Sequence, residues 1–198
     1  MPFHKAPRMR RLFVFWRSHN LPMDDIVRQA IAKWPNVPNC WGWLGLDARG
    51  NWYMRDDRAQ AAGPFPESKG SVLRHEKLID FIGRNYEADD QGRWFFQNGP
   101  QRVYVELENT PLVFRIGPRR EVTTHTGRDA KVNGVVIDEL GRAYLDTDAG
   151  IGIVHTLDME ALADAVESGD WRTRELAAAE LPSLYGFVRS PASTREAA

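Results

Sequence analysis

Cysteine, long apolar runs and net charge are all scarce in this 198-residue sequence. Cys40 is the single cysteine, so no disulfide bond can form within the chain, which suits a reducing cytoplasm. No apolar run approaches the about 20 residues that cross a bilayer. The run from Leu12 to Trp16 is also too short for the core of a secretory signal. These absences predict a cytoplasmic protein without a membrane span.

The net charge of −1 excludes little by itself, but the charge is unevenly distributed. Residues 1–22 hold five basic and no acidic residues, which leaves −6 for the rest of the chain. A body of that charge repels phosphate backbones, so the sequence argues against a nucleic-acid partner for the folded part.

The basic leader, residues 1–22, shows no sustained helical or strand period. Met23 follows it and precedes a clean amphipathic pattern. We therefore expect a disordered tail or a start of translation at Met23, with a basic arm that touches an anionic surface as the alternative.

Motifs for metal or cofactor binding are absent. His75-Glu76 opens like a zinc-hydrolase motif, but the position that needs a second histidine is Ile79. Asp146 and Asp148 precede a glycine, but apolar residues follow where a calcium loop needs more oxygen ligands. We therefore expect no metal and no cofactor, and we expect Cys40 to be a small buried thiol rather than a nucleophile.

One turn pattern occurs three times: an acidic residue, two variable residues, a glycine, and then aromatic or apolar strand residues. The copies span 47–50, 89–92 and 138–141. Glycine supplies the positive φ that a tight hairpin turn requires. The pattern predicts three β-hairpins, arisen by duplication or as a recurrent turn solution.

Helical periodicity appears in short segments between these hairpins. Residues 24–34 place Ile26, Val27, Ala30, Ile31 and Trp34 on one face. We also predict helices over 75–86, from Asp158, and over 171–181. The fold class expected is α+β, with mainly antiparallel hairpins, short packed helices and two small subdomains at 23–117 and 118–182, followed by a tail at 183–198.

The 7 tryptophans are the most unusual feature of the composition. Several aromatic residues lie on predicted strands, where neighbours point to opposite faces, so they cannot all face one core. Either helices at 24–34 and 75–86 cover both faces of the sheet, or an aromatic surface binds a ligand or partner. The residues of that candidate surface are Trp41, Trp43, Trp52, Trp94 and Phe96.

A second candidate site is polar. The stretch 123–128 contains hydroxyls, a histidine and an arginine, which could bind an anion. The residues assigned to this anion site are Arg74, Arg102, His125 and Arg128. The alternative is an ordinary hydrogen-bonded turn.

The stretch from Trp34 to Trp52, continued by residues 74–79 and 92–108, resembles an uncharacterised proteobacterial family of unknown function, over roughly Met23 to Val166. Residues 42–116 also loosely resemble a second uncharacterised bacterial family, whose acidic strand and closing turn fall at 106–111. Neither resemblance implies an activity. Both support a hairpin–helix–hairpin arrangement.

Without a catalytic set, the sequence favours a non-enzymatic binding or accessory module that uses its aromatic surface. The partner would be a protein, a small molecule or a second copy of the chain. The alternative is an enzyme that acts on a small anionic substrate through the polar residues above, which requires their side chains to converge in one pocket.

Overall fold

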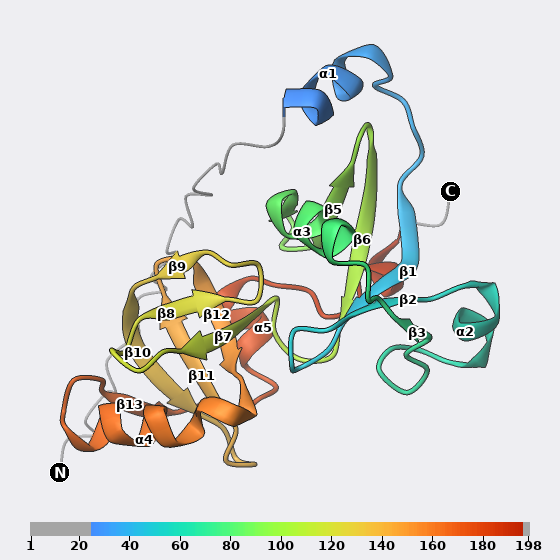
Figure 1. Ribbon diagram of the computed structural model, residues 1–198. Coiled ribbons are helices and arrows are strands. Elements are labelled where there is room, and N and C mark those ends of the chain that lie inside the picture. Colours follow the sequence, from blue (N-terminus) through green and yellow to red (C-terminus); the bar gives the residue numbers. More distant parts are fainter. Residues whose placement is uncertain (1–24, 196–198) are drawn as a thin grey trace, which may run out of the picture.

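The protein is described from a computed structural model, which defines residues 25–195. The predicted leader lies outside these residues. Two mixed β-sheets, A and B, follow one another along the chain, with short helices around them (Figure 1). Most of the strand pairs described are antiparallel, as predicted, and the fold class is α+β.

Sheet A has six strands in the spatial order β3-β2-β1-β6-β5-β4. Their bounds are β1 Cys40–Leu46, β2 Trp52–Met54, β3 Ser71–Val72, β4 Tyr86–Ala88, β5 Trp94–Asn98 and β6 Gln101–Leu107. The central pair, β1 and β6, is parallel, and Leu44 lies opposite Val105. A register shift between Cys40 and Leu44 marks a bulge around Gly42, whose φ of 76° a side chain would resist.

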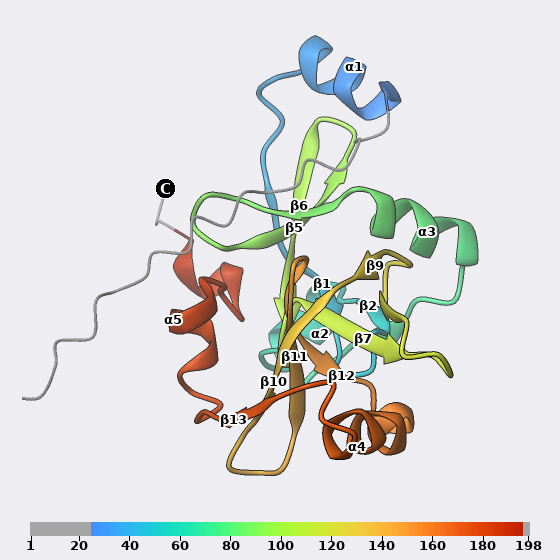
Figure 2. The same ribbon diagram turned by 90° about the vertical axis from the view of Figure 1, so that its left-hand side faces the viewer.

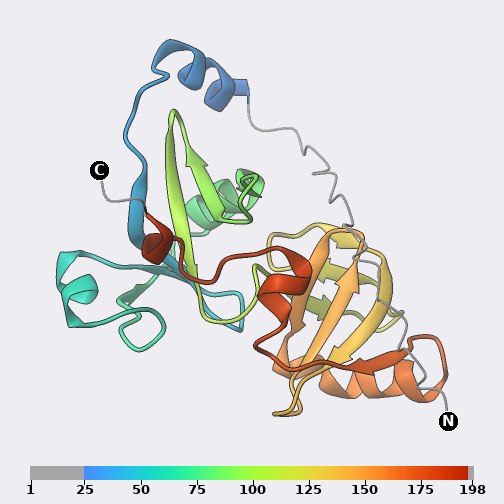
Figure 3. The ribbon, with the colours of Figure 1, turned by 180° about the vertical axis from the view of Figure 1, so that it is seen from behind.

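Sheet B has seven strands in the order β13-β10-β11-β12-β7-β8-β9. Their bounds are β7 Leu112–Ile116, β8 Val122–Thr124, β9 Asp129–Ala130, β10 Val132–Ile137, β11 Ala143–Thr147, β12 Gly150–Val154 and β13 Thr173–Glu175. Lys131 alone separates β9 from β10, although β9 is one edge of the sheet and β10 lies near the other. The sheet therefore curls until its two ends approach each other, as in an open barrel (Figure 3).

The helices are short. Their bounds are α1 Asp25–Lys33, α2 Asp57–Ala62, α3 Glu76–Arg84, α4 Met159–Glu167 and α5 Leu181–Tyr185, with 3₁₀ turns η1 Thr156–Asp158 and η2 Pro191–Thr194. His75 caps α3 because its ring nitrogen accepts a hydrogen bond from the Leu78 amide. Tyr86, expected at the end of that helix, begins β4 instead.

The predicted apolar face of α1 is mostly exposed. Val27 is the buried residue of this helix, while Ile26 and Trp34 are 76% and 52% exposed. The helix lies beyond the tip of the β5–β6 hairpin rather than on the sheet (Figure 1). α3 does pack against β5, where the Phe81 and Phe96 rings meet edge to face. The expectation of a sheet covered by both helices was therefore wrong for α1.

The C-terminal region also differs from the prediction. Instead of a helix over 171–181, the chain forms β13 at the edge of sheet B and then α5, which starts around Pro182. The predicted tail returns to sheet A, where the Leu107 amide donates to Arg189 O and the Ala192 amide donates to the Glu106 carboxylate (Figure 3). Residues 187–195 thus form a C-terminal strap across sheet A.

The change from one sheet to the other falls at residues 108–111, between β6 and β7. The boundary predicted at 117/118 instead lies within a hairpin turn of sheet B, because β7 pairs with β8 on its far side. One continuous cluster of buried apolar side chains joins the two sheets. Among the described residues, no helix is long and apolar enough to cross a membrane.

Candidate functional site

The three predicted hairpin turns are built in the same way, and we call them the aspartate turns, after Asp47, Asp89 and Asp138. In each, one carboxylate oxygen accepts hydrogen bonds from the backbone amides two and four residues later, at 2.8 to 3.0 Å. The glycine three residues later has a φ between 73° and 84°. The carboxylate oxygen thus accepts hydrogen bonds from turn amides that have no partner in the strand pairing.

The second carboxylate oxygen of each aspartate turn binds side chains. It accepts one bond from the side chain four residues later and one from a tyrosine hydroxyl. The donor pairs are Asn51 and Tyr53 for Asp47, Arg93 and Tyr104 for Asp89, and Arg142 and Tyr144 for Asp138. All of these carboxylates are therefore saturated, and their geometry indicates structural support rather than acid–base chemistry.

The predicted anion-binding stretch is a fourth turn of this type. Thr124 replaces the aspartate, and its hydroxyl oxygen accepts a hydrogen bond from the Arg128 amide at 3.1 Å. Gly127, with a φ of 78°, takes the place of the turn glycine. The Thr124 and Thr126 hydroxyls also lie 2.8 Å apart, so both are engaged in the turn.

His125 lies inside the molecule, between the two sheets. Its ring is 5.5 Å from that of Trp52 and 5.8 Å from that of Tyr86. Nδ1 accepts from the Val113 amide, while Nε2 is buried without a hydrogen-bond partner. Burial, aided by the nearby Arg128 charge, lowers the pKa of His125 to about 3. The ring is thus neutral near pH 7 and offers no charge to an anion.

The arginines assigned to the anion site do not converge with His125 on one free pocket. The Arg128 guanidinium donates to the Gly83 and Tyr86 carbonyls. Burial raises the pKa of Glu87, and the charges of Arg102 and Arg128 oppose that shift, so both lie near this carboxylate. Arg74 is exposed on the link between β3 and α3, and no contact joins it to the other three. The charges of Arg102 and Arg128 therefore act on the Glu87 carboxylate, and no contact places either guanidinium group beside His125 in an open pocket.

The aromatic residues predicted to form a surface fall into two groups. Trp52, Trp94 and Phe96 are 2%, 6% and 6% exposed, and they belong to the central core cluster. Tyr86 lies against both indoles, edge to face on Trp52. Trp94 and Phe96 are two residues apart on β5, so their rings lie on the same face of the strand. Together with Trp52, they line the apolar interior. Trp41 and Trp43 remain at the surface.

Trp41 and Trp43 precede Leu44 on β1, and we call the surface that they form with Arg93 and Arg102 the aromatic face. Trp43 is 38% exposed. Trp41 is half-buried and stacks on Tyr104 of β6, with ring centroids 3.9 Å apart and planes 6° from parallel. Tyr104 is buried, so Trp41 covers it and presents its own outer surface.

Two guanidinium groups complete the aromatic face. The Arg93 group lies 5.5 Å from the Trp41 ring and 5.1 Å from the Tyr104 ring, and the Asp89 carboxylate holds it in place. The Arg102 group lies 4.5 Å from the Phe95 ring and is exposed. It forms no ion pair with any carboxylate in the described part of the chain. Aromatic rings beside guanidinium groups form a surface that suits apolar and anionic groups together.

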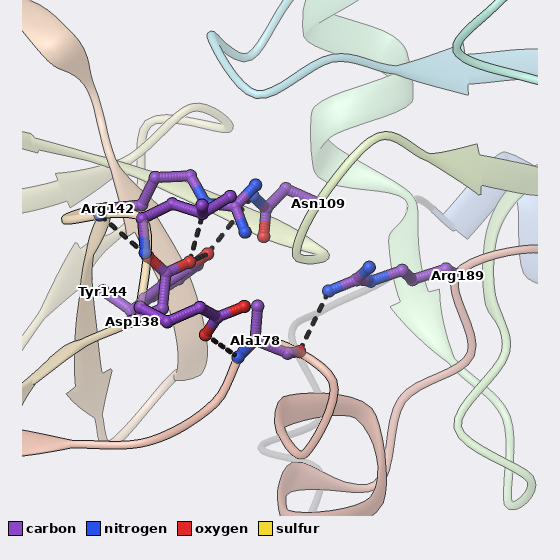
Figure 4. Close-up of polar contacts among 8 residues, drawn as sticks. Asn109, Asp138, Arg142, Tyr144, Ala178 and Arg189 are labelled. Atoms are coloured by element: carbon purple, nitrogen blue, oxygen red, sulfur yellow. Dashed lines mark hydrogen bonds and ion pairs between the residues drawn. The ribbon is translucent and has the colours of Figure 1, made fainter.

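A second polar cluster occupies the junction of the two sheets (Figure 4). Asp138 lies at its centre, with a side chain that is fully buried. Burial would raise the pKa of Asp138, but hydrogen bonds from Arg142 and Tyr144 hold it below its ordinary value. Burial also raises the pKa of Tyr144 to about 12. The pair is thus a fixed carboxylate and a neutral phenol.

The far side of this junction cluster contains polar atoms without partners. Asn109 Nδ2 donates to the Tyr144 hydroxyl, which leaves Asn109 Oδ1 buried and unpaired. Arg189 donates to the Ala178 carbonyl, while its Nε is also buried and unpaired (Figure 4). The junction thus contains one buried acceptor and one buried donor without a hydrogen-bond partner among the described residues.

The residues that sequence reasoning missed are Arg93 and Tyr104 on the aromatic face, and Asn109 and Arg189 at the junction. Arg93 carried a usable signal, because an arginine follows the turn aspartate by four residues in two of the three aspartate turns. The others act through distant partners. Among residues 25–195, no cluster of three or more histidine, cysteine, aspartate or glutamate side chains could hold a metal ion.

Comparison with known proteins returns families without an assigned activity. A family model described as "Protein of unknown function (DUF2946)" matches residues 23–192. No curated protein matches the chain. Among solved structures, a DUF1285 family protein from Silicibacter pomeroyi DSS-3 is similar, with 14% identity and a TM-score of 0.44, over 65% of this chain and 72% of that one.

Proposed function

The chain belongs to the family described as "Protein of unknown function (DUF2946)", and we propose that it is a non-enzymatic binding module. Its binding surface is the aromatic face, and its partner is an acidic peptide segment of another protein. The observation that carries this proposal is the exposed indole of Trp43, two residues after Trp41 on β1, together with the stack of Trp41 on Tyr104.

Burial elsewhere in sheet A makes the exposure of these indoles informative. The other aromatic residues of its strands, such as Trp52 and Trp94, are deep in the core, except the half-buried Tyr53. A large ring left at the surface beside a pre-ordered aromatic stack offers apolar area at low entropic cost. Tryptophan, tyrosine and arginine are the residue types that dominate the binding energy of protein interfaces.

The charge of the aromatic face selects the partner. Arg102 has no ion pair with a described carboxylate, and the Asp89 contact fixes Arg93 rather than removing its remaining donors. A fixed guanidinium group presents several N–H donors in a geometry that matches a carboxylate. An acidic side chain next to an apolar one would therefore satisfy both parts of the surface.

The alternative of an enzyme acting on a small anion has less support. Its histidine is buried and neutral near pH 7, and its two adjacent arginines lie beside Glu87. A general base needs a pKa near the working pH and access to its substrate. His125 meets neither condition.

Peptide selection from a random display library tests the binding proposal, with dissociation constants measured for the enriched sequences. We expect enrichment of sequences that combine acidic and apolar residues. Trp43→Ala should weaken binding at least about tenfold, because truncating a central aromatic contact costs about 2 kcal/mol. Arg102→Gln should weaken binding less and reduce its salt dependence.

Trp34→Ala is the matched control, because Trp34 is also exposed but directly follows α1. It should leave the dissociation constants unchanged. The proposal fails if no sequence is enriched, or if the Trp43 and Trp34 variants bind equally well. A concentration-dependent dimer in light scattering that Trp43→Ala dissociates would instead identify a second copy as the occupant.

A further inference from the structure

The outer part of the C-terminal strap, residues 190–195, is hydrogen-bonded to sheet A through one buried carboxylate, that of Glu106. Figure 2 shows α5 and the strap together along one side of the molecule, and η2 packs against β1 and β6. The Ala192 amide donates to the Glu106 carboxylate at 3.1 Å, and the Ser190 hydroxyl donates to the same group. The hydrogen bonds that this carboxylate accepts therefore come from the strap.

The inner part of the strap, residues 187–189, is anchored separately. Phe187 is 4% exposed, and backbone hydrogen bonds join this part to Gly92 and Leu107. In the outer part, by contrast, the last three described residues, which end with Arg195, are exposed. The outer part can therefore leave sheet A while the inner part stays in place.

Glu106 is buried without a cation of its own. It is 4% exposed and forms no ion pair within residues 25–195. The Arg55 charge reaches it, but the Arg55 guanidinium donates to three backbone carbonyls. Lys69 pairs with Glu108 instead, and Arg189 donates to a carbonyl of the strap side. An ionised carboxylate in such a place makes closure of the outer strap costly.

The proton equilibrium of Glu106 is therefore coupled to the position of the outer strap. Burial raises the pKa of Glu106 above its ordinary value of 4.5, although the bonds from Ser190 and Ala192 and the charge of Arg55 oppose the shift. When the outer strap leaves, water solvates the carboxylate and its pKa returns toward the ordinary value. The closed form thus binds a proton more tightly. Its gain in stability is complete below pH 4.5 and is lost as the pH rises through the raised value.

We propose that the outer strap is a proton-controlled latch, which closes on sheet A when Glu106 binds a proton and opens when Glu106 releases it. Opening uncovers a charged carboxylate two residues from Tyr104 on the same face of β6, beside the aromatic face. A lower pH therefore also favours an acidic partner there, a consequence that rests on the function proposed above. The latch itself does not depend on that function.

Hydrogen exchange at the Ala192 amide, followed by nuclear magnetic resonance, tests the latch without any ligand. Its rate is divided into the rate of an unstructured peptide at the same pH, which gives a protection factor. In the wild type, this factor should rise between pH 7 and pH 5, because protonation favours closure. The core amide of Leu145 should show the opposite trend, because the buried His125 favours the unfolded chain as the pH falls.

Variants of the carboxylate and of its donor separate the latch from global stability. Glu106→Gln keeps an acceptor for the Ala192 amide without the charge, so it should raise the protection factor at pH 7 at least about threefold and abolish its pH dependence. Glu108→Gln is the matched control on the same strand, since this carboxylate binds Lys69 rather than the strap. It should leave exchange at Ala192 unchanged.

Ser190→Ala gives a second test, which does not require a change in the interior of sheet A. It removes one donor to the ionised carboxylate, so it should lower the protection factor of Ala192 at pH 7 more than at pH 5. The latch is refuted if Ala192 follows the core amide at both pH values, or if Glu106→Gln leaves its protection unchanged or lowers it.

Discussion

Sheets A and B contain the same aspartate turn, but the burial and the neighbours of the turn differ between them. In sheet B, the Asp138 side chain is fully buried at the junction, and the strands around it are filled with aliphatic residues such as Leu145 and Ile153. In sheet A, the Asp89 side chain is 9% exposed, and the turn holds an arginine beside rings that reach the surface. One local motif thus supports a closed interior in one sheet and an open aromatic face in the other.

This contrast explains where binding is expected. A closed sheet gains stability from apolar burial, which leaves little reason for an indole to stay outside it. The outer side of sheet A keeps two indoles and two guanidinium groups together at the surface. Surfaces of that composition are costly to maintain without a partner, since exposed apolar patches favour association.

Removing the turn carboxylate should have the largest effect and should differ between the sheets. Asp138→Ala should lower the free energy of unfolding by about 3 kcal/mol, and Asp89→Ala by about 2 kcal/mol. Both variants lose four hydrogen bonds, but Asp138→Ala removes a carboxylate that is fully buried, whereas the Asp89 side chain is 9% exposed. Urea denaturation measures both values.

Equal losses for these two aspartates would contradict the contrast between the sheets. Asp129→Asn is a suitable control, because this aspartate is exposed and has no hydrogen bond within the described residues. Its free energy of unfolding should stay within about 0.5 kcal/mol of the wild type.

The aspartate turns show which parts of the fold can be predicted from the sequence. All three hairpins were predicted, since an acidic residue, a glycine and the following strand lie within a few positions. Non-local pairings left no such signal: β1 joins β6 in parallel, and β7 joins β12 in parallel, each across more than one other element. The C-terminal strap was missed for the same reason, because Arg189 and Ala192 bond to β6 far back in the chain.

Burial was harder to predict than secondary structure. The period of residues 24–34 predicted the helix α1 but also an apolar face, and Ile26 and Trp34 of that face are exposed. Periodicity reports which side chains share a face, and only the tertiary arrangement decides whether anything covers it. For this reason, only part of the predicted aromatic surface lies at the surface. Trp41 and Trp43 are at least partly exposed, whereas Trp52, Trp94 and Phe96 are buried.

Two strand glycines offer a second comparison of the sheets. A methyl group at Gly152 of sheet B would lie 2.6 Å from the Phe114 ring, and one at Gly45 of sheet A would lie 2.6 Å from the Phe65 ring. Phe114 is on a central strand and fully buried, whereas Phe65 is on the loop after α2. The Phe114 ring therefore has less room to move than the Phe65 ring.

Gly152→Ala should therefore lower the free energy of unfolding by about 3 kcal/mol, because the added methyl group overpacks a rigid part of the core. Gly45→Ala should lower it by about 1 kcal/mol, because the Phe65 ring can move away. Gly134→Ala controls for the backbone effect, because its nearest atom would be 3.5 Å away at an unstrained distance. If Gly45→Ala proved the more damaging change, the loop over sheet A would be the more rigid part.

The last comparison concerns pH and sets a histidine between the sheets against one at the start of α3. His125 is buried with a pKa of about 3, against an ordinary value of 6.5, so the unfolded chain binds the proton more readily. Stability is complete above pH 6.5 and is lost as the pH falls from 6.5 toward 3. Between pH 7 and pH 5, this residue should cost about 2 kcal/mol.

His125→Asn should remove this part of the pH dependence while its amide oxygen still accepts from the Val113 amide. His75→Asn is the control, because His75 is exposed at the start of α3, where its ring nitrogen makes the same kind of bond to Leu78. Denaturation curves at pH 7 and pH 5 should therefore converge for the first variant and stay apart for the second. If both variants kept the wild-type difference in stability between pH 7 and pH 5, His125 would titrate as an exposed group does. The interior between the sheets would then be accessible to protons.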